Sequence, residues 1–165
     1  MINYEDVLEL AKEVLDELIT RRLTIAIGES CTGGLVSSFI TDFNGSSEVF
    51  QTGIIAYSAE AKEEFLGVPD YVIQNFGTIS IECAKLMAEG ATQYDADIGV
   101  AITGVIGESI EGKLKGTVFI AIAISDQQSF ARELKLDPRK TRYELKLEIT
   151  YQVFKTLLEV IDEVY

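Results

Sequence analysis

Three adjacent side chains with reactive groups, Ser30, Cys31 and Thr32, follow a short apolar run and precede two glycines in the segment GESCTGG. A serine hydroxyl or a cysteine thiol at such a turn could attack a carbonyl carbon if a nearby base accepts its proton. The chain contains no histidine, so that base must be a lysine, a tyrosine or a carboxylate. The alternative interpretation is structural: Ser30 or Thr32 caps the next helix, and Gly33 and Gly34 allow close packing.

Two further segments carry side chains that could assist this chemistry. AYSAEAK places Tyr57 at the end of an apolar run and Lys62 about one helical turn later. AITG ends another apolar run with Thr103 and Gly104, and a glycine-containing loop follows that could surround a ligand. The alternatives are a half-buried tyrosine, a surface lysine and a mobile crossover between core strands.

A cationic segment, DPRKTR, precedes the last helical pattern. Arg139 and Arg142 lie near the start of that helix, where the dipole favours anions, so the segment indicates an anionic ligand or an ion pair with a carboxylate. GESCTGG has neither the Gly-Lys-Ser/Thr ending of a phosphate-binding loop nor the glycine spacing of a dinucleotide fingerprint.

Composition limits the classes of protein that this chain can be. It has 165 residues, 47% of them apolar, which fits a single domain over residues 1–165. The net charge of −13 argues against nucleic acid or an anionic membrane as a partner. No apolar run is long enough to span a bilayer and the first residues are acidic, so we expect a cytoplasmic protein. The two cysteines, Cys31 and Cys83, are too few for a disulfide framework or a cysteine metal site.

The elements that position these residues alternate between strands and helices. Ligands of such folds bind where strands end and helices begin, which is where GESCTGG lies. The alternation predicts a three-layer α/β/α sandwich around a largely parallel or mixed sheet. The expected strands are 23–27, 49–58, 96–104, 116–125 and an edge strand in 127–136, and the expected helices are 7–18, 32–43, 59–67, 68–77, 80–95 and a last helix from Pro138.

Several of these motifs occur together in one known family. ESCTGG, IIAYSAEAKEEFLGV, GTIS, MAEGA, AITG and GTVFIAIA, in this order, resemble the C-terminal domain of the CinA competence-damage family. That domain also occurs alone as nicotinamide-nucleotide amidase. The resemblance extends from about residue 6 to residue 160. The resemblance does not include the nucleotide-hydrolase domain that precedes this domain in full-length members.

The resemblance implies a role for each matching residue. Ser30 would be the nucleophile and Lys62 its base, with Tyr57 as a proton relay or substrate contact. Thr103 and Gly104 would line the site for nicotinamide mononucleotide. Backbone N–H groups of the turn at Cys31, Thr32 and Gly33 would hold substrate and oxyanion, and Arg139 matches the arginine of the family's Gly-Asp-Arg element.

The implied reaction converts the nucleotide's carboxamide to nicotinate mononucleotide and ammonia, without a metal or an organic cofactor. Lys62 must then be neutral near pH 7, well below its ordinary pKa of about 10.4, which requires a dry pocket and a second cation such as Arg139 or Lys113. Cys31 is the rival nucleophile, because a thiolate is intrinsically stronger.

Two departures from the family pattern keep other functions open. The loop VIGESIEGKLKGTV lacks the family's proline and carries two acidic residues. Gly-Asp-Arg has become Asp-Pro-Arg, and the family's next arginine falls nearest Arg142 or Tyr143. An inactive paralogue that binds nucleotides or proteins is therefore one alternative, and a Ser-Lys amidase or esterase for another small amide is a second. Unpaired helix faces also suggest a homo-oligomer.

Overall fold

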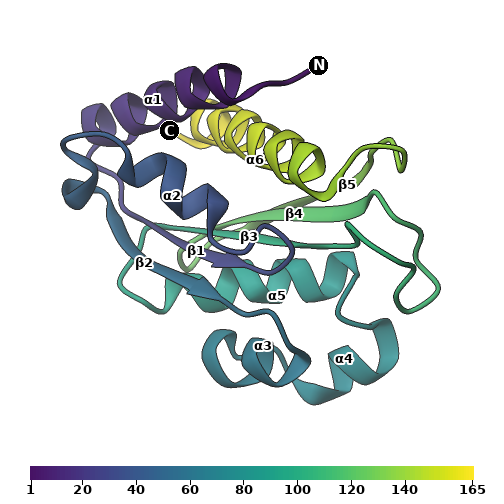
Figure 1. Cartoon of the computed structure of the whole chain (residues 1–165). Helices are drawn as coiled ribbons and strands as arrows, with labels where there is room; N and C mark the ends of the chain where they lie inside the picture. The colour runs from purple at the N-terminus through teal and green to yellow at the C-terminus, as the bar shows by residue number, and fades with distance from the viewer.

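A five-stranded mixed sheet separates two layers of helices in the computed structural model, which describes residues 1–165 (Figure 1). The strand order is β2-β1-β3-β4-β5. The first three strands in that order run parallel, and β4 and β5 are added as antiparallel hairpins. The predicted three-layer sandwich is therefore confirmed. The strands are β1 Ile25–Glu29, β2 Phe50–Ile55, β3 Ile98–Gly104, β4 Thr117–Ile124 and β5 Ser129–Lys135.

Three helices lie on each side of the sheet (Figure 1). One layer contains α1 Tyr4–Arg21, α2 Leu35–Thr41 and α6 Arg142–Val164. The other contains α3 Ala59–Leu66, α4 Asp70–Phe76 and α5 Ile81–Thr92, and a short 3-10 helix, η1 Ser46–Glu48, precedes β2. No helix has both the length and the apolar character needed to cross a membrane.

The last helix begins later than the sequence predicts. Thr141 caps α6, and its hydroxyl accepts the Glu144 N–H while the Glu144 carboxylate accepts the Thr141 N–H. Pro138 lies in the preceding turn instead. Its fixed φ suits a turn as well as the first helical position, so the reciprocal cap at Thr141 decides where the helix starts.

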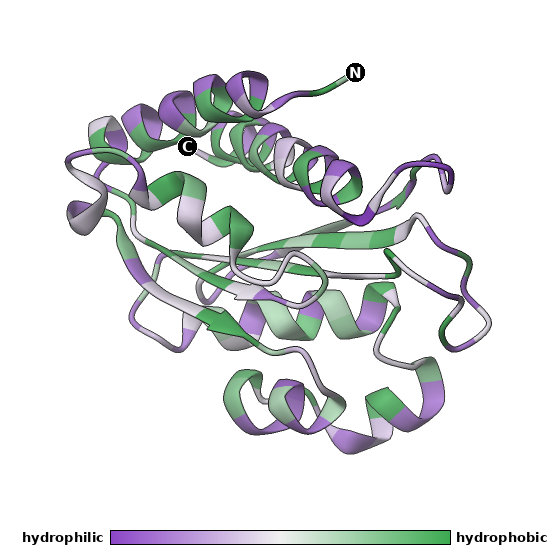
Figure 2. Cartoon of the chain, viewed as in Figure 1, coloured by the Kyte–Doolittle hydropathy of each residue, from purple (hydrophilic) through white to green (hydrophobic).

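The two faces of the central strands carry side chains of different size. Along β3 and β4 the larger residues, such as Ile102 and Ile120, belong to the core beneath α1, α2 and α6. The alternate positions, such as Ala101 and Ala121, belong to the core beneath α3, α4 and α5. In Figure 2 β4 is mostly green, whereas α1 and α6 alternate between green and purple. Central strands covered on both faces and helices covered on one produce this contrast.

Helix α3 is held against α5 at a glycine. A β-carbon on Gly90 of α5 would lie 1.8 Å from the carbonyl oxygen of Leu66, so only glycine permits this approach. The residues of α3 that are buried are Leu66 and, one turn earlier, Lys62. The close packing of α3 therefore directs a lysine toward the interior.

Candidate active site

Ser30 lies where the carboxyl ends of the three parallel strands meet. Its N–H donates to the carbonyl oxygen of Ile102 on β3 at 3.1 Å. On the other side, the N–H of Ala56 donates to the carbonyl oxygen of Glu29 at 2.7 Å. These bonds continue the parallel pairing beyond β1, so the ends of β2 and β3 flank Ser30 as expected for a ligand site of this fold.

Lys62 reaches Ser30 from α3. Its Nζ lies 3.1 Å from Ser30 Oγ, 2.8 Å from the carbonyl oxygen of Ala56 and 3.5 Å from that of Tyr57. Both side chains are withdrawn from water, with 2% of Lys62 and 7% of Ser30 exposed. The structure thus brings together two residues that are 32 positions apart in the sequence.

Burial shifts the protonation of Lys62 in the direction that a base requires. Loss of hydration lowers its pKa below the ordinary value of 10.5, while the nearby Cys83, Cys31 and Glu111 act in the opposite direction. A neutral amine has two N–H groups, which the carbonyls of Ala56 and Tyr57 can accept, and its lone pair then faces Ser30 Oγ. An ammonium group would find three acceptors at the same positions. Both protonation states are therefore accommodated.

Neither Ser30 nor Thr32 caps α2, so the capping part of the structural interpretation of GESCTGG is wrong. Gly34 occupies the N-cap position and provides no side-chain cap. The buried carboxylate of Glu29 accepts from the backbone N–H groups of Val36 and Ser37 instead, each at 3.0 Å. It also accepts the hydroxyls of Thr32 and Ser37 at 2.7 Å, so Glu29 organises the whole turn and the Ser30 hydroxyl is left for Lys62.

The turn after Ser30 presents backbone N–H groups that have no acceptor in the protein. The amides of Cys31, Thr32 and Gly34 make no hydrogen bond, whereas that of Gly33 donates to the Ser30 carbonyl at 3.0 Å. Gly33 and Gly34 have φ values of +60° and +99°, which turn the chain sharply toward α2. Free amides beside a serine hydroxyl can stabilise an oxyanion formed on that hydroxyl's target.

Cys31 borders the same site but is held as a thiol. It is 6% exposed and packs with the core beneath α6, and burial raises its pKa to about 12. Burial likewise raises the pKa of Cys83, on α5, to about 11. Because the thiolate is the reactive form, these values favour Ser30 over Cys31 as the nucleophile.

A cavity of about 510 Å³ opens above the Ser30–Lys62 pair, within the ~300–1,000 Å³ typical of small-molecule sites. Tyr57 at its rim accepts a hydrogen bond on its hydroxyl from Arg142 at 3.3 Å. The residues that line it are Ser30, Cys31, Tyr57, Lys62, Thr78, Ile79, Gly104, Ile106, Gly107, Glu108, Ser109, Ile110 and Arg142.

Thr32, Gly33 and Thr103, which the sequence places in the substrate site, do not line this cavity. The Thr103 hydroxyl is fully buried and donates to the Thr78 carbonyl oxygen at 2.7 Å. Thr103 therefore supports the cavity wall, and Gly104 beside it faces the cavity. The Thr32 hydroxyl is bound to Glu29, as described above.

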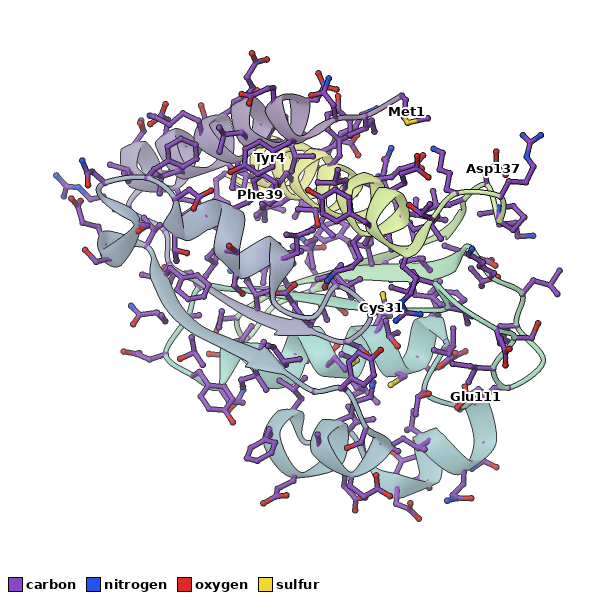
Figure 3. The ribbon with its side chains drawn as sticks, viewed as in Figure 1. Met1, Tyr4, Cys31, Phe39, Glu111 and Asp137 are labelled. Carbon is purple, nitrogen blue, oxygen red and sulfur yellow. The ribbon has the colours of Figure 1, made fainter.

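The cation at the cavity is Arg142, whereas the sequence indicates Arg139 or Lys113. The Arg139 side chain is 89% exposed and forms an ion pair with Asp137 at 2.8 Å. Figure 3 shows Asp137 in the turn before α6, well away from Cys31. Lys113 lines a separate groove on the other side of its loop. Arg142 is the first residue of α6, so the later start of this helix leaves Arg139 in the preceding turn and places Arg142 at the helix end beside the cavity. Arg142 forms no ion pair.

Sequence reasoning also missed Glu29 and Glu111. Glu29 is signalled only by its place between an apolar strand and the glycines of the turn. Glu111 contacts Thr78 and Ile79, two cavity residues about thirty positions earlier. Its sequence neighbourhood carries no signal for this contact, because Glu-Gly is not among the dipeptides that favour a two-residue turn and the partners are distant in the chain.

Comparisons with known proteins agree with this architecture. The "CinA C-terminal domain" family model matches residues 7–161. A "Putative competence-damage inducible protein" of Listeria welshimeri is 42% identical over 124 residues, covering 74% of this chain, and the chain spans 30% of that relative. A Mycoplasma pneumoniae protein, "Protein MG115 homolog", is 35% identical over 156 residues, covering 93% of this chain and 98% of its own length.

Solved structures extend the agreement to the fold. The crystal structure of the competence/damage inducible protein CihA from Agrobacterium tumefaciens is 29% identical and superposes with a TM-score of 0.89. The match covers 95% of this chain and 96% of that one. By its sequence and by its fold, the chain belongs to the CinA C-terminal domain family.

Proposed function

We propose that this protein is a Ser-Lys amidohydrolase that converts nicotinamide mononucleotide to nicotinate mononucleotide and ammonia. The observation that carries the proposal is the buried 3.1 Å contact between Lys62 Nζ and Ser30 Oγ at the floor of a cavity. A buried lysine whose pKa is lowered by desolvation, next to a serine at a strand end, has the properties of a nucleophile and its base.

The first half of the reaction forms an acyl-enzyme. Ser30 Oγ attacks the carboxamide carbon while its proton passes to neutral Lys62, and the free amide of Cys31, which borders the cavity, stabilises the oxyanion. The C–N bond then breaks, and the leaving nitrogen takes the proton from the Lys62 ammonium and departs as ammonia. The nicotinoyl group remains on Ser30 as an ester.

The second half uses the same groups on water. Water gives a proton to Lys62 and attacks the ester carbon, and collapse of the intermediate returns that proton to Ser30 Oγ. The products are free enzyme and nicotinate mononucleotide. A lysine that alternates between two protonation states needs partners for both, and the carbonyls of Ala56 and Tyr57 supply them.

Arg142 is the proposed contact for the substrate's phosphate. It borders the cavity, carries no ion pair and is already oriented by Tyr57. A guanidinium without a carboxylate partner is well suited to bind a phosphate through two parallel hydrogen bonds. The surrounding protein has a net charge of −13, so a local cation is needed to hold an anionic substrate.

The test is ammonia release from nicotinamide mononucleotide by wild type, Ser30→Ala and Lys62→Met. Loss of either group is expected to lower kcat by at least about 10³-fold. The matched controls are Ser38→Ala and Lys155→Met, which remove the same groups from exposed positions on α2 and α6. A wild-type protein that releases no ammonia, or a Ser30→Ala variant that retains full activity, contradicts the proposal.

The altered 103–116 loop favours a second candidate, a nucleotide-binding protein without amidase activity. Thermal stabilisation by nicotinamide mononucleotide without ammonia release would select it. Ammonia from other carboxamides but not from the nucleotide would instead indicate a Ser-Lys amidase of different specificity.

We also propose that the protein is cytoplasmic and forms a homo-oligomer. The exposed apolar side chains Ile55, Tyr57 and Tyr143 support the oligomer, because they provide a surface for a second copy.

A further inference from the structure

We propose that Glu111 is a positioning residue, whose carboxylate fastens the 105–116 loop over the Ser30–Lys62 pair and so keeps Lys62 dry. Its catalytic consequence rests on the proposed amidase function, but the fastening itself can be tested without turnover. Figure 3 shows Glu111 on the α4 side of the molecule, at the loop that leaves β3. The loop is one of the two parts of the chain that depart from the family pattern.

The tip of the loop is a tight two-residue turn. Ile110 and Lys113 exchange backbone hydrogen bonds at 3.2 and 2.8 Å across it. The two residues between them, Glu111 and Gly112, have φ values of 54° and 72°, the left-handed conformation that such turns require. Glutamate adopts this conformation reluctantly, so its presence here calls for a compensating interaction.

The compensation comes from the segment before α5. One carboxylate oxygen of Glu111 accepts the Thr78 N–H at 3.0 Å and the Thr78 hydroxyl at 2.8 Å. The other accepts the Ile79 N–H at 3.0 Å. Partial burial raises the pKa of Glu111, but these hydrogen bonds and Lys113 outweigh it and hold the pKa below the ordinary 4.5. Glu111 is therefore ionised near neutral pH, and it joins the loop tip to two residues of the cavity wall.

The other arm of the loop closes the cavity. Residues 106–110 line the cavity, and Arg142 Nη1 lies 2.7 Å from where a β-carbon of Gly107 would be. Arg142 in turn donates to the Tyr57 hydroxyl. The loop thus spans from Thr78 on one rim to Arg142 on the other, and release of Glu111 would free its tip and admit water.

Water at Lys62 has a predictable effect on catalysis. Desolvation is the largest cause of the lowered Lys62 pKa, so hydration would raise the pKa and move the acid limb of the rate profile to higher pH. The charge of Glu111 by itself acts in the opposite sense, because it raises the Lys62 pKa and its removal would lower it. The other ionisable groups around Lys62 and its cavity are Cys31, Cys83, Tyr57, Glu108 and Arg142, and all remain in the variants.

Two substitutions distinguish the effect of the Glu111 carboxylate from the effect of the turn conformation. Glu111→Asn keeps a residue that tolerates the left-handed conformation but is too short and uncharged to make the same contacts. Glu111→Gln keeps the length but presents an amide N–H₂ to one of the donors, so we expect an intermediate effect. Glu13→Gln on the exposed face of α1 removes the same charge far from the loop and is the control.

The first readout is alkylation of the two free cysteines by iodoacetamide at pH 8, followed by peptide mass spectrometry. Cys31 borders the cavity, and Cys83 is fully buried and reports general unfolding. We expect Cys31 to react at least about tenfold faster in Glu111→Asn, equivalent to about 1.4 kcal/mol, with no change at Cys83. Equal Cys31 rates in variant and wild type, or a parallel rise at Cys83, would overturn the proposal.

The second readout is the pH dependence of kcat for ammonia release. The acid limb of Glu111→Asn is expected to lie at higher pH than that of wild type and Glu13→Gln. A limb that stays in place or moves to lower pH would indicate that only the charge of Glu111 matters, and would overturn the positioning role. If the wild type releases no ammonia, the proposed function fails, and the cysteine experiment still decides whether Glu111 fastens the loop.

Discussion

Replacement of Lys62 by methionine is expected to abolish activity and to change how stability depends on pH. Methionine has a similar unbranched shape and no charge, so it can occupy the same channel between α3 and Ser30. It cannot accept a proton, and it leaves the carbonyls of Ala56 and Tyr57 without their lysine donor. Those lost bonds lower stability by an amount that does not vary with pH. The substitution also removes proton binding by the Lys62 amine, and the contribution of that proton binding to the free energy of unfolding does vary with pH.

The sign follows from the lowered pKa of Lys62. In the unfolded chain the amine titrates near 10.5, whereas in the folded protein it titrates lower because it is desolvated. Between these two values the unfolded state binds the extra proton, so the wild type loses stability as the pH falls. The loss amounts to about 1.4 kcal/mol per pH unit and stops at the folded pKa. Lys62→Met lacks this term, so relative to the wild type it gains stability as the pH falls below 10.5.

The assay is urea unfolding of wild type and Lys62→Met at intervals from pH 7 to pH 10.5. The difference in unfolding free energy between the two proteins removes the titration of groups that Lys62 does not influence. Lys62 lowers the pKa of both buried thiols, but their pKa values of about 12 and about 11 lie above the pH range of the assay. Lys155→Met, at an exposed position, should show no such dependence and serves as the control. A difference between Lys62→Met and wild type that is constant over this range would refute the claim that burial lowers the Lys62 pKa, and with it the base role.

Four further substitutions test the site around the pair. Glu29→Gln should lower the unfolding free energy by about 1–3 kcal/mol, because its amide N–H₂ would face a backbone N–H of α2; unchanged urea unfolding would contradict the capping role. Cys31→Ala should retain ammonia release, since a thiol with a pKa of about 12 is protonated near neutral pH, and inactivity of a folded variant would restore Cys31 as the nucleophile. Arg142→Met should raise KM for the nucleotide at least about tenfold with little change in kcat, whereas Arg139→Met should leave both constants unchanged. A raised KM in Arg139→Met with an unchanged KM in Arg142→Met would place the phosphate in the turn before α6.

Residue order alone was sufficient to predict the layers of the fold. The strands and helices alternate, and each has a periodicity that is set locally, by burial on two faces for β3 and β4 and on one face for α1 and α6. Boundaries were less accurate where two local signals competed. Pro138 suits both a helix start and a turn, and the Thr141–Glu144 cap determined the outcome.

The reactive residues were predicted largely through the family resemblance rather than from their chemistry. Ser30 could equally have been a helix cap until Glu29 was seen to take that role. Similarly, a lysine on a short acidic helix is usually a surface residue, and the segment AYSAEAK has no feature that predicts burial of Lys62. The reason lies in α5, where Gly90 allows α3 to pack closely.

The sequence by itself determined the sandwich architecture and the absence of a histidine base, because each depends on residue type and short-range spacing. Only the tertiary structure decided that Lys62 reaches Ser30, that Arg142 rather than Arg139 borders the cavity, and that Glu111 binds Thr78. Those contacts join segments from separate elements, and their distances depend on how closely the helices pack on the sheet. Desolvation, which lowers the pKa of Lys62, is likewise a property of the packed interior and has no local sequence signal.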